Sequence, residues 1–110
     1  MPSLVEVTTD SFQREVLEES SCAVVVDFWS ATCPHCLRFN PEFEAAAETL
    51  ASEVKFTKIT AQEGVELFRQ HRVRSTPTSI VFRGGQEIAR REGFLPAAEL
   101  VEWVRQTCAE

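Results

Sequence analysis

The segment AVVVDFW, residues 23–29, constrains the fold of this chain more than any other stretch. It is almost continuously apolar and rich in β-branched residues, which is typical of a central strand with both faces buried. A strand that is buried on both faces needs helices on both sides of its sheet. The segment therefore predicts an α/β protein built around this strand.

The rest of the chain alternates between strand-like and helix-like patterns. We expect the remaining strands at 4–7, 54–60, 78–83 and 86–93, and helices at 10–20, 34–51, 64–71 and 96–107. Asp10 followed by Gln13 fits a capping box at the start of the first helix. The order β-α-β-α-β-α-β-β-α predicts a mixed sheet with helices on both faces. The chain has 110 residues and no repeat, which fits one domain over residues 1–110.

Charge and hydropathy exclude several classes of function. The net charge is −6 and the basic residues are scattered, so no basic patch is available for nucleic acid, and anionic membranes are disfavoured. The N-terminus lacks the basic and apolar regions of a secretory signal, and the longest apolar run is far too short to span a membrane. We therefore expect a cytoplasmic monomer with no nucleic-acid or membrane partner.

Residues 31–38, ATCPHCLR, contain two cysteines three positions apart. In a chain with four cysteines and no secretory signal, a close pair indicates redox chemistry or metal binding first. The strand that ends near Trp29 leads into a helix for which Pro34 is a suitable first residue. Cys33 then lies at the helix start and Cys36 one turn further along, where a disulfide can form but is somewhat strained and easily reduced.

The helix start also sets the acidity of this pair. Free backbone N–H groups and the positive end of the helix dipole stabilise a thiolate, so we assign Cys33 as the nucleophile and Cys36 as the resolving thiol. A protonated or hydrogen-bond-donating imidazole at His35 would add to this effect. A stabilised thiolate favours the reduced pair, which makes the disulfide a stronger oxidant.

Asp27 interrupts the buried strand six residues before Cys33. A buried carboxyl group without a partner has a raised pKa, and such an acid could take a proton from Cys36 and return it. Lys58 on a neighbouring strand could offset part of the negative charge of Asp27. The alternative is an aspartate at the strand end that is exposed to solvent.

The segment STPTS, residues 75–79, places Pro77 just before a strand. A cis Thr76–Pro77 bond would present the backbone of Thr76 to an incoming chain. A trans turn is the more common form of such a bond, so the sequence by itself leaves both open.

Taken together, these features resemble the thioredoxin family. VVVDFWSATCPHC, a proline at position 41 in the long helix, Lys58, STPT and Gly93 follow that family's order and spacing over nearly the whole chain. The resemblance implies the thioredoxin fold and the following roles: Cys33 as nucleophile, Cys36 as resolving thiol, Asp27 as proton acceptor near Lys58, Pro77 as a cis proline, and Trp29, Thr76 and Gly93 in the substrate-docking surface.

The resemblance also implies an activity and its partners. We expect a protein-disulfide reductase whose substrates are oxidised proteins and whose electron donor is a flavoenzyme of the thioredoxin-reductase type. The Cys33–Cys36 disulfide would be its only redox group, with no further cofactor and no metal. The chain has no glycine-rich dinucleotide loop, so we expect it to bind no nucleotide itself.

The motif departs from the usual WCGPC of the family in two ways. Thr32 replaces the tryptophan, which removes an aromatic part of the docking surface. The dipeptide Pro34–His35 is the one found in periplasmic disulfide oxidases. Their reduction potential is about −120 mV, against about −270 mV for thioredoxin. However, the chain leaves no room for the helical insertion of those oxidases, and Asp27 favours a reductase. We therefore expect a reductase that is less reducing than ordinary thioredoxin.

Other functions stay open at this stage. One is a disulfide oxidase or isomerase of the same fold. Another is a zinc or iron–sulfur site on Cys33, His35 and Cys36, which would have to be shared between two chains because a closed site needs four ligands. A third is a non-catalytic binding module, which would have no need of both cysteines. We interpret Cys22 and Cys108 as packing residues or bystander thiols, far from the active pair and not bridged.

Overall fold

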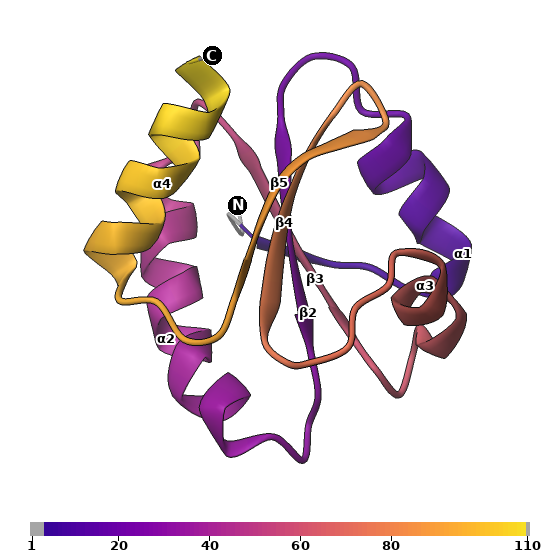
Figure 1. Ribbon diagram of the computed structural model, residues 1–110. Helices are drawn as coiled ribbons and strands as arrows, with labels where there is room; N and C mark the ends of the chain where they lie inside the picture. The colour runs from indigo at the N-terminus through magenta and orange to yellow at the C-terminus, as the bar shows by residue number, and fades with distance from the viewer. Residues whose placement is uncertain (1–3, 110) are drawn as a thin grey trace.

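The computed structural model of the chain describes residues 4–109 (Figure 1). Residues 1–3 and Glu110, which the predicted domain 1–110 also includes, lie outside the described residues. The elements are β1 (Leu4–Glu6), α1 (Thr9–Phe12), the π-helical turn η1 (Gln13–Leu17), β2 (Val24–Trp29), α2 (Pro34–Thr49), β3 (Lys55–Thr60), α3 (Val65–Gln70), β4 (Thr78–Arg83), β5 (Gln86–Glu92) and α4 (Ala97–Ala109). This order confirms the predicted one, with small shifts at the element ends.

The strand predicted from AVVVDFW is the middle strand of a five-stranded sheet with the order β1-β3-β2-β4-β5. β2 pairs in parallel with β3 and antiparallel with β4, so the sheet is mixed, as expected. Val24 to Phe28 are all buried, which explains why the segment lacks polar and apolar alternation. α2 and α4 cover one face of the sheet, and α1, η1 and α3 cover the other (Figure 1).

Successive side chains of β2 enter two separate cores, because strand residues alternate between the faces of a sheet. Val25 belongs to the core that contains Phe39 of α2, whereas Phe28 belongs to the core that contains Phe12 of α1. Each large apolar side chain buried in this way stabilises the fold by about 1.5–3 kcal/mol. By the same alternation, Asp27 lies on the α2 face, which is the face of the cysteine pair.

The longest helix, α2, carries the predicted apolar stripe on its buried side. The buried members of that stripe are Phe39, Phe43, Ala46, Ala47 and Leu50. Pro41 lies inside the helix, where it has no N–H to donate to the preceding turn. Within residues 4–109, no helix is both long enough and apolar enough to cross a lipid bilayer.

The start of the first helix differs from the expected capping box. Thr8 is the N-cap, and its hydroxyl oxygen accepts from the backbone N–H of Ser11 at 3.3 Å while Ser11 Oγ accepts from Thr8 N at 2.9 Å. The prediction of Asp10 with Gln13 was wrong, because the helix begins at Thr9 and a serine hydroxyl fills the role expected of a glutamine. Gln13 instead opens the π-helical turn, where its carbonyl accepts from Glu18 N at 2.9 Å.

Candidate active site

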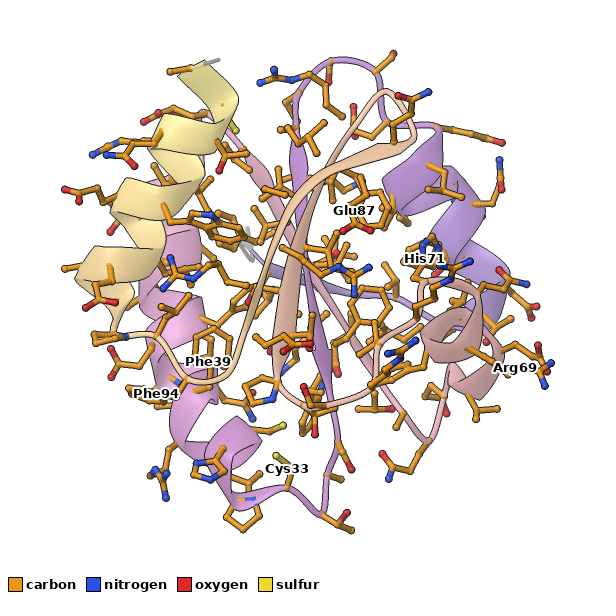
Figure 2. All side chains as sticks on the ribbon, viewed as in Figure 1. Cys33, Phe39, Arg69, His71, Glu87 and Phe94 are labelled. Carbon is orange, nitrogen blue, oxygen red and sulfur yellow. The ribbon has the colours of Figure 1, made fainter. Side chains whose placement is uncertain are left out.

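The two cysteines of the CPHC segment lie at the start of α2, directly after β2. Figure 2 shows Cys33 at this position. Cys33 is the N-cap of the helix in extended backbone conformation, and Pro34 is the first helical residue, as predicted. The Cys33 sulfur accepts a hydrogen bond from Cys36 N at 3.2 Å, the bond that a serine or aspartate oxygen makes at an ordinary N-cap. The sequence therefore places a sulfur where the helix presents free N–H groups.

This position makes the two thiols unequal in acidity. Burial tends to raise the pKa of Cys33, but hydrogen bonds from Cys36, from the Thr76 side chain and from the backbone N–H of His35 outweigh it, so the pKa is lowered. Cys36 is fully buried, and its burial raises its pKa to about 11, with Cys33 adding to the rise. At neutral pH, Cys33 is therefore the thiol available for attack, and Cys36 needs help to lose its proton.

Asp27 is fully buried, so the solvent-exposed alternative was wrong. Its burial raises its pKa to about 8, the positive charge of Lys58 offsets part of this rise, and the negative charge of Cys33 adds to it. Lys58 is the partner of Asp27 in the β2–β3 register. Among residues 4–109, no group forms a hydrogen bond with either carboxylate oxygen. The structure thus provides a neutral acid at physiological pH on the face of the sheet that α2 covers.

The segments expected to form the docking surface meet beside Cys33. The Thr76–Pro77 bond is cis, as the resemblance implied, and the Thr76 carbonyl lies 3.5 Å from Cys33 Sγ. Gly93 donates from its backbone N–H to the Pro77 carbonyl at 2.8 Å and has a φ of 93°, a conformation that favours glycine. Trp29 is partly exposed, and Lys58 Nζ lies 5.0 Å from the centroid of its ring.

Two exposed apolar side chains near this surface were missed by the sequence analysis. Phe94 follows Gly93, is 42% exposed, and its ring packs edge-on against Phe39 with centroids 6.1 Å apart (Figure 2). Leu37, which follows Cys36 in α2, is 53% exposed. Their only signal in the sequence is that each follows a predicted site residue, which does not show whether an apolar side chain faces solvent.

His35 contacts the site differently from what we expected. Its backbone N–H contributes to lowering the pKa of Cys33. Its imidazole pairs with Arg38, whose Nη2 lies 2.6 Å from His35 Nδ1. A guanidinium group can only donate, so Nδ1 accepts this bond. In the structure, the backbone N–H of His35 therefore helps to stabilise the Cys33 thiolate, while its ring contacts Arg38 on the next turn of the helix.

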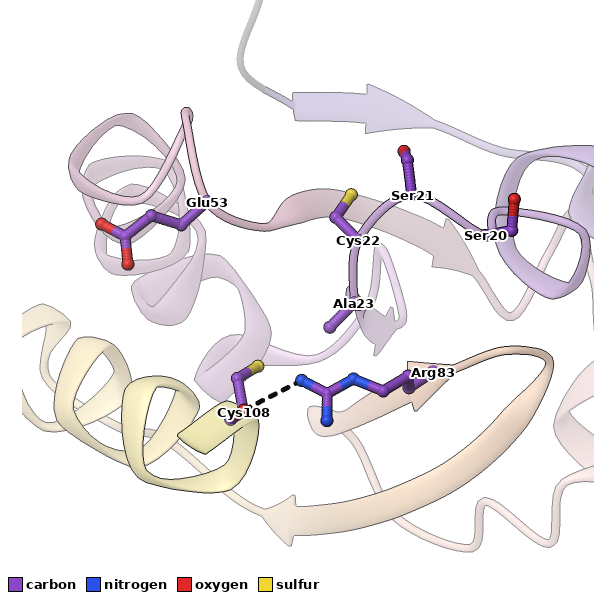
Figure 3. Close-up of a pocket in the computed structure, with 7 residues that line it drawn as sticks. All are labelled: Ser20, Ser21, Cys22, Ala23, Glu53, Arg83 and Cys108. Atoms are coloured by element: carbon purple, nitrogen blue, oxygen red, sulfur yellow. Dashed lines mark hydrogen bonds between the residues drawn. The ribbon is translucent and has the colours of Figure 1, made fainter. Parts of the chain in front are cut away.

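The remaining cysteines lie at the other end of the central strand. Cys22 precedes β2, and Cys108 lies in the last turn of α4. All four cysteines are free, and Cys22 and Cys108 line one cavity together (Figure 3). The sequence analysis did not foresee that shared cavity. In the described part of the chain, no three His, Cys, Asp or Glu side chains are arranged to hold a metal ion.

A mixed α/β sheet that presents an acidic thiol at a helix start, backed by a buried second thiol, defines a thiol–disulfide oxidoreductase. The family model described as Thioredoxin matches residues 3–106. Similar proteins include a thioredoxin of Rickettsia bellii, 35% identical over 89% of this chain and 92% of its own length, and thioredoxin 1 of a Nostoc species, 32% identical over 91% and 92%. A thioredoxin of Mycoplasma pneumoniae is 37% identical over 79% of this chain and 84% of its own length. The chain belongs to the thioredoxin family.

Proposed function

We propose that this protein reduces disulfides in oxidised cytoplasmic proteins and is itself reduced by a flavoenzyme of the thioredoxin-reductase type. The observation that carries this proposal is the difference in acidity between Cys33 and Cys36 within one helical turn. A reductase of this kind needs one thiol that attacks at neutral pH and a second that acts only after the first has formed an adduct. In this proposal the Cys33–Cys36 pair is the only redox group, so no metal or nucleotide is required.

In the first step the Cys33 thiolate attacks one sulfur of a substrate disulfide docked beside Thr76 and Pro77. The substrate S–S bond breaks, a mixed disulfide forms with Cys33, and the other substrate sulfur leaves as a thiolate and takes up a proton. The apolar side chains of Leu37 and Phe94 would contact the docked chain in place of the tryptophan that Thr32 replaces.

In the second step Cys36 must lose its proton and attack Cys33 Sγ. Formation of the mixed disulfide removes the negative charge of Cys33, one of the causes that raise the pKa of Asp27. The ionised form of Asp27 therefore becomes more populated when a base is needed, and it accepts the Cys36 proton. Attack of the Cys36 thiolate on Cys33 releases the second substrate thiol. Two electrons have then passed from the cysteine pair to the substrate.

Trapping with Cys36→Ser tests this reaction. Without the resolving thiol, the variant should accumulate a mixed disulfide between Cys33 and an oxidised substrate such as insulin, detectable by mass spectrometry and reversed by dithiothreitol. The matched control is Cys108→Ser, which keeps both active thiols and should turn over like the unmodified protein. If Cys36→Ser captures no substrate, or if the adduct forms on another cysteine, the proposed reaction is wrong.

The proposed reduction potential lies between about −270 mV and about −120 mV, the values of thioredoxin and of the disulfide oxidase with the same dipeptide. The placement of Cys33 at the helix N-cap and the dipeptide Pro34–His35 support a value above the lower limit. Disulfide oxidase activity is the second candidate, favoured by that dipeptide alone. The chain between α2 and β4 consists of β3 and α3, so it lacks the helical insertion of that family.

A further inference from the structure

A cavity of about 310 Å³ lies beside the last turn of α4 (Figure 3). The C-terminal end of α4 lies at the opposite end of the sheet from the start of α2 (Figure 1). Cys22, Glu53, Arg83 and Cys108 line it. Ligand pockets in proteins measure about 300–1,000 Å³, so this cavity would hold a molecule no larger than a small peptide. The six residues of β2 separate Cys22 from the turn that leads to Cys33, so an occupant here would not cover the redox pair.

The charges around this cavity favour an anion. Arg83 Nη2 donates to the Cys108 carbonyl at 3.0 Å (Figure 3). Among residues 4–109 no carboxylate forms a salt bridge with Arg83. The one acidic side chain of the lining, Glu53, pairs with Arg105 at 3.4 Å. The cavity therefore offers a guanidinium with donors to spare on a protein whose net charge is −6.

The same guanidinium bears on the reactivity of Cys108. The pKa of the Cys108 thiol is raised, chiefly by burial and also by the nearby Cys22 and Glu53, while the charge of Arg83 and a hydrogen bond from it offset part of this rise. Arg83 thus limits the rise in the pKa of Cys108, and its guanidinium can attract a carboxylate beside that thiol. The shared location of thiol, cation and cavity is the feature that carries the inference.

We propose that this cavity is a second thiol-modification site, where Cys108 forms a mixed disulfide with a low-molecular-weight acidic thiol of up to tripeptide size. The Cys108 thiolate attacks one sulfur of the symmetrical disulfide of that small thiol. The S–S bond of the reagent breaks, a new S–S bond joins Cys108 to one half, and the other half leaves as a thiolate that takes up the proton given up by Cys108. The incoming disulfide is the oxidant, and a carboxylate of the bound half contacts Arg83.

The test compares three disulfide reagents of different charge on Cys33→Ser/Cys36→Ser protein, in which the redox pair cannot compete. The reagents are oxidised glutathione, which is anionic, hydroxyethyl disulfide, which is neutral, and cystamine, which is cationic. Each rate is divided by the rate of the same reagent with N-acetylcysteinamide, and peptide mapping by mass spectrometry locates the adduct. We expect oxidised glutathione to modify Cys108 about three- to fivefold faster than cystamine after this correction.

Arg83→Gln should abolish that preference, while Glu53→Gln should preserve or increase it. The same variants leave the Cys33–Cys36 pair intact in the otherwise unmodified protein, so its turnover checks that they fold. The proposal fails if cystamine reacts as fast as oxidised glutathione, if the adduct maps to Cys22, or if a Cys22–Cys108 disulfide forms instead. It also fails if Arg83→Gln leaves the preference unchanged, since Arg83 would then serve only to bind the last carbonyls of α4.

Discussion

At the scale of single residues, the chemistry depends on where each titratable group sits relative to free N–H groups and to solvent. Cys33 and Cys36 share one helical turn, yet the first accepts hydrogen bonds at the helix start and the second is enclosed. Asp27 is enclosed as well, and nothing in residues 4–109 forms a hydrogen bond with it. Two predictions belong at this scale, one on His35 and one on Asp27.

Replacing His35 by glycine removes the imidazole but keeps the backbone N–H that contributes to lowering the pKa of Cys33. We expect the ring to favour the Cys33 thiolate as well, so His35→Gly should lower the reduction potential of the Cys33–Cys36 pair by about 30 mV or more, which corresponds to about a tenfold change in the equilibrium constant. The measurement is equilibration with glutathione buffers of known potential. Arg38→Gln, which removes the partner of His35 Nδ1, is the matched variant. A potential of the unmodified protein at or below about −270 mV contradicts the role assigned to the dipeptide.

The buried carboxyl group of Asp27 should make the free energy of unfolding fall as the pH rises. Its pKa is about 8 in the folded protein against 3.8 for an exposed aspartate, so between these values the folded state holds one proton more than the unfolded state. Stability then decreases with pH in this window, by up to about 1.4 kcal/mol per pH unit, and the decrease ends above about pH 8. Asp27→Asn should flatten this dependence. Urea unfolding of the reduced proteins at pH 5, 6, 7 and 8 measures it, and parallel curves for the two proteins contradict a buried, protonated Asp27.

At the scale of elements, each helix start depends on which short polar residue occupies the N-cap position. For α2 this residue is a cysteine, so the cap and the nucleophile are the same group. For α1 it is Thr8, whereas the sequence analysis had assigned Asp10 to this role. Thr, Asp and Ser occur together in the stretch TTDS, and only the direction of the chain leaving β1 decides which of them becomes the cap.

The capping assignment can be tested with a pair of variants. Thr8→Ala should lower the free energy of unfolding by about 0.5–2 kcal/mol, because it removes the hydroxyl that accepts from Ser11 N. Asp10→Ala should change it by no more than about 0.5 kcal/mol, since Thr8 and not Asp10 is the N-cap of α1. Urea unfolding at constant pH measures both. A larger loss for Asp10→Ala than for Thr8→Ala would restore the capping box that the sequence predicted.

At the scale of the whole molecule, the two ends of the sheet carry different groups of residues. One end holds the redox pair with the Thr76–Pro77 and Gly93 segments, and the other holds the cavity shared by Cys22 and Cys108. The hairpin between β4 and β5 reaches across to the helical layer on the second face. There, a Cβ added at Gly85 would lie 2.9 Å from the carbonyl oxygen of Leu17, which is closer than packed atoms allow.

That contact predicts unequal costs for two neighbouring substitutions. Gly84 and Gly85 both have positive φ, 58° and 82°, but only at Gly85 would a Cβ meet another segment. Gly85→Ala should therefore lower the free energy of unfolding by about 1–3 kcal/mol, and Gly84→Ala by less. Thermal or urea unfolding of the two variants gives the comparison. Equal losses would mean that the hairpin does not contact η1 as described.

Much of this protein was determined by the sequence itself, because the signals concerned are local. The run at 23–29 predicted a central strand, the spacing of apolar residues predicted α2, and the CPHC segment after a strand placed a thiol at a helix start. These inferences need only the periodicity of one element and the free N–H groups at its end. The roles of Trp29 and Gly93 came from resemblance to a family alone, whereas those of Asp27, Lys58 and Thr76 were also argued from the residues. All of these roles remain proposals here.

Only the tertiary structure decided which residues from distant elements share a space. It enclosed Asp27 and exposed Phe94 beside the docking segments. It also brought Cys22 and Cys108, which are 86 positions apart in the sequence, to one cavity with Arg83. Burial, and with it the pKa of a carboxyl or thiol group, depends on everything packed around that group. Neighbours across a sheet or between a loop and a helix end leave no periodic trace in the chain, so no local pattern could have revealed them.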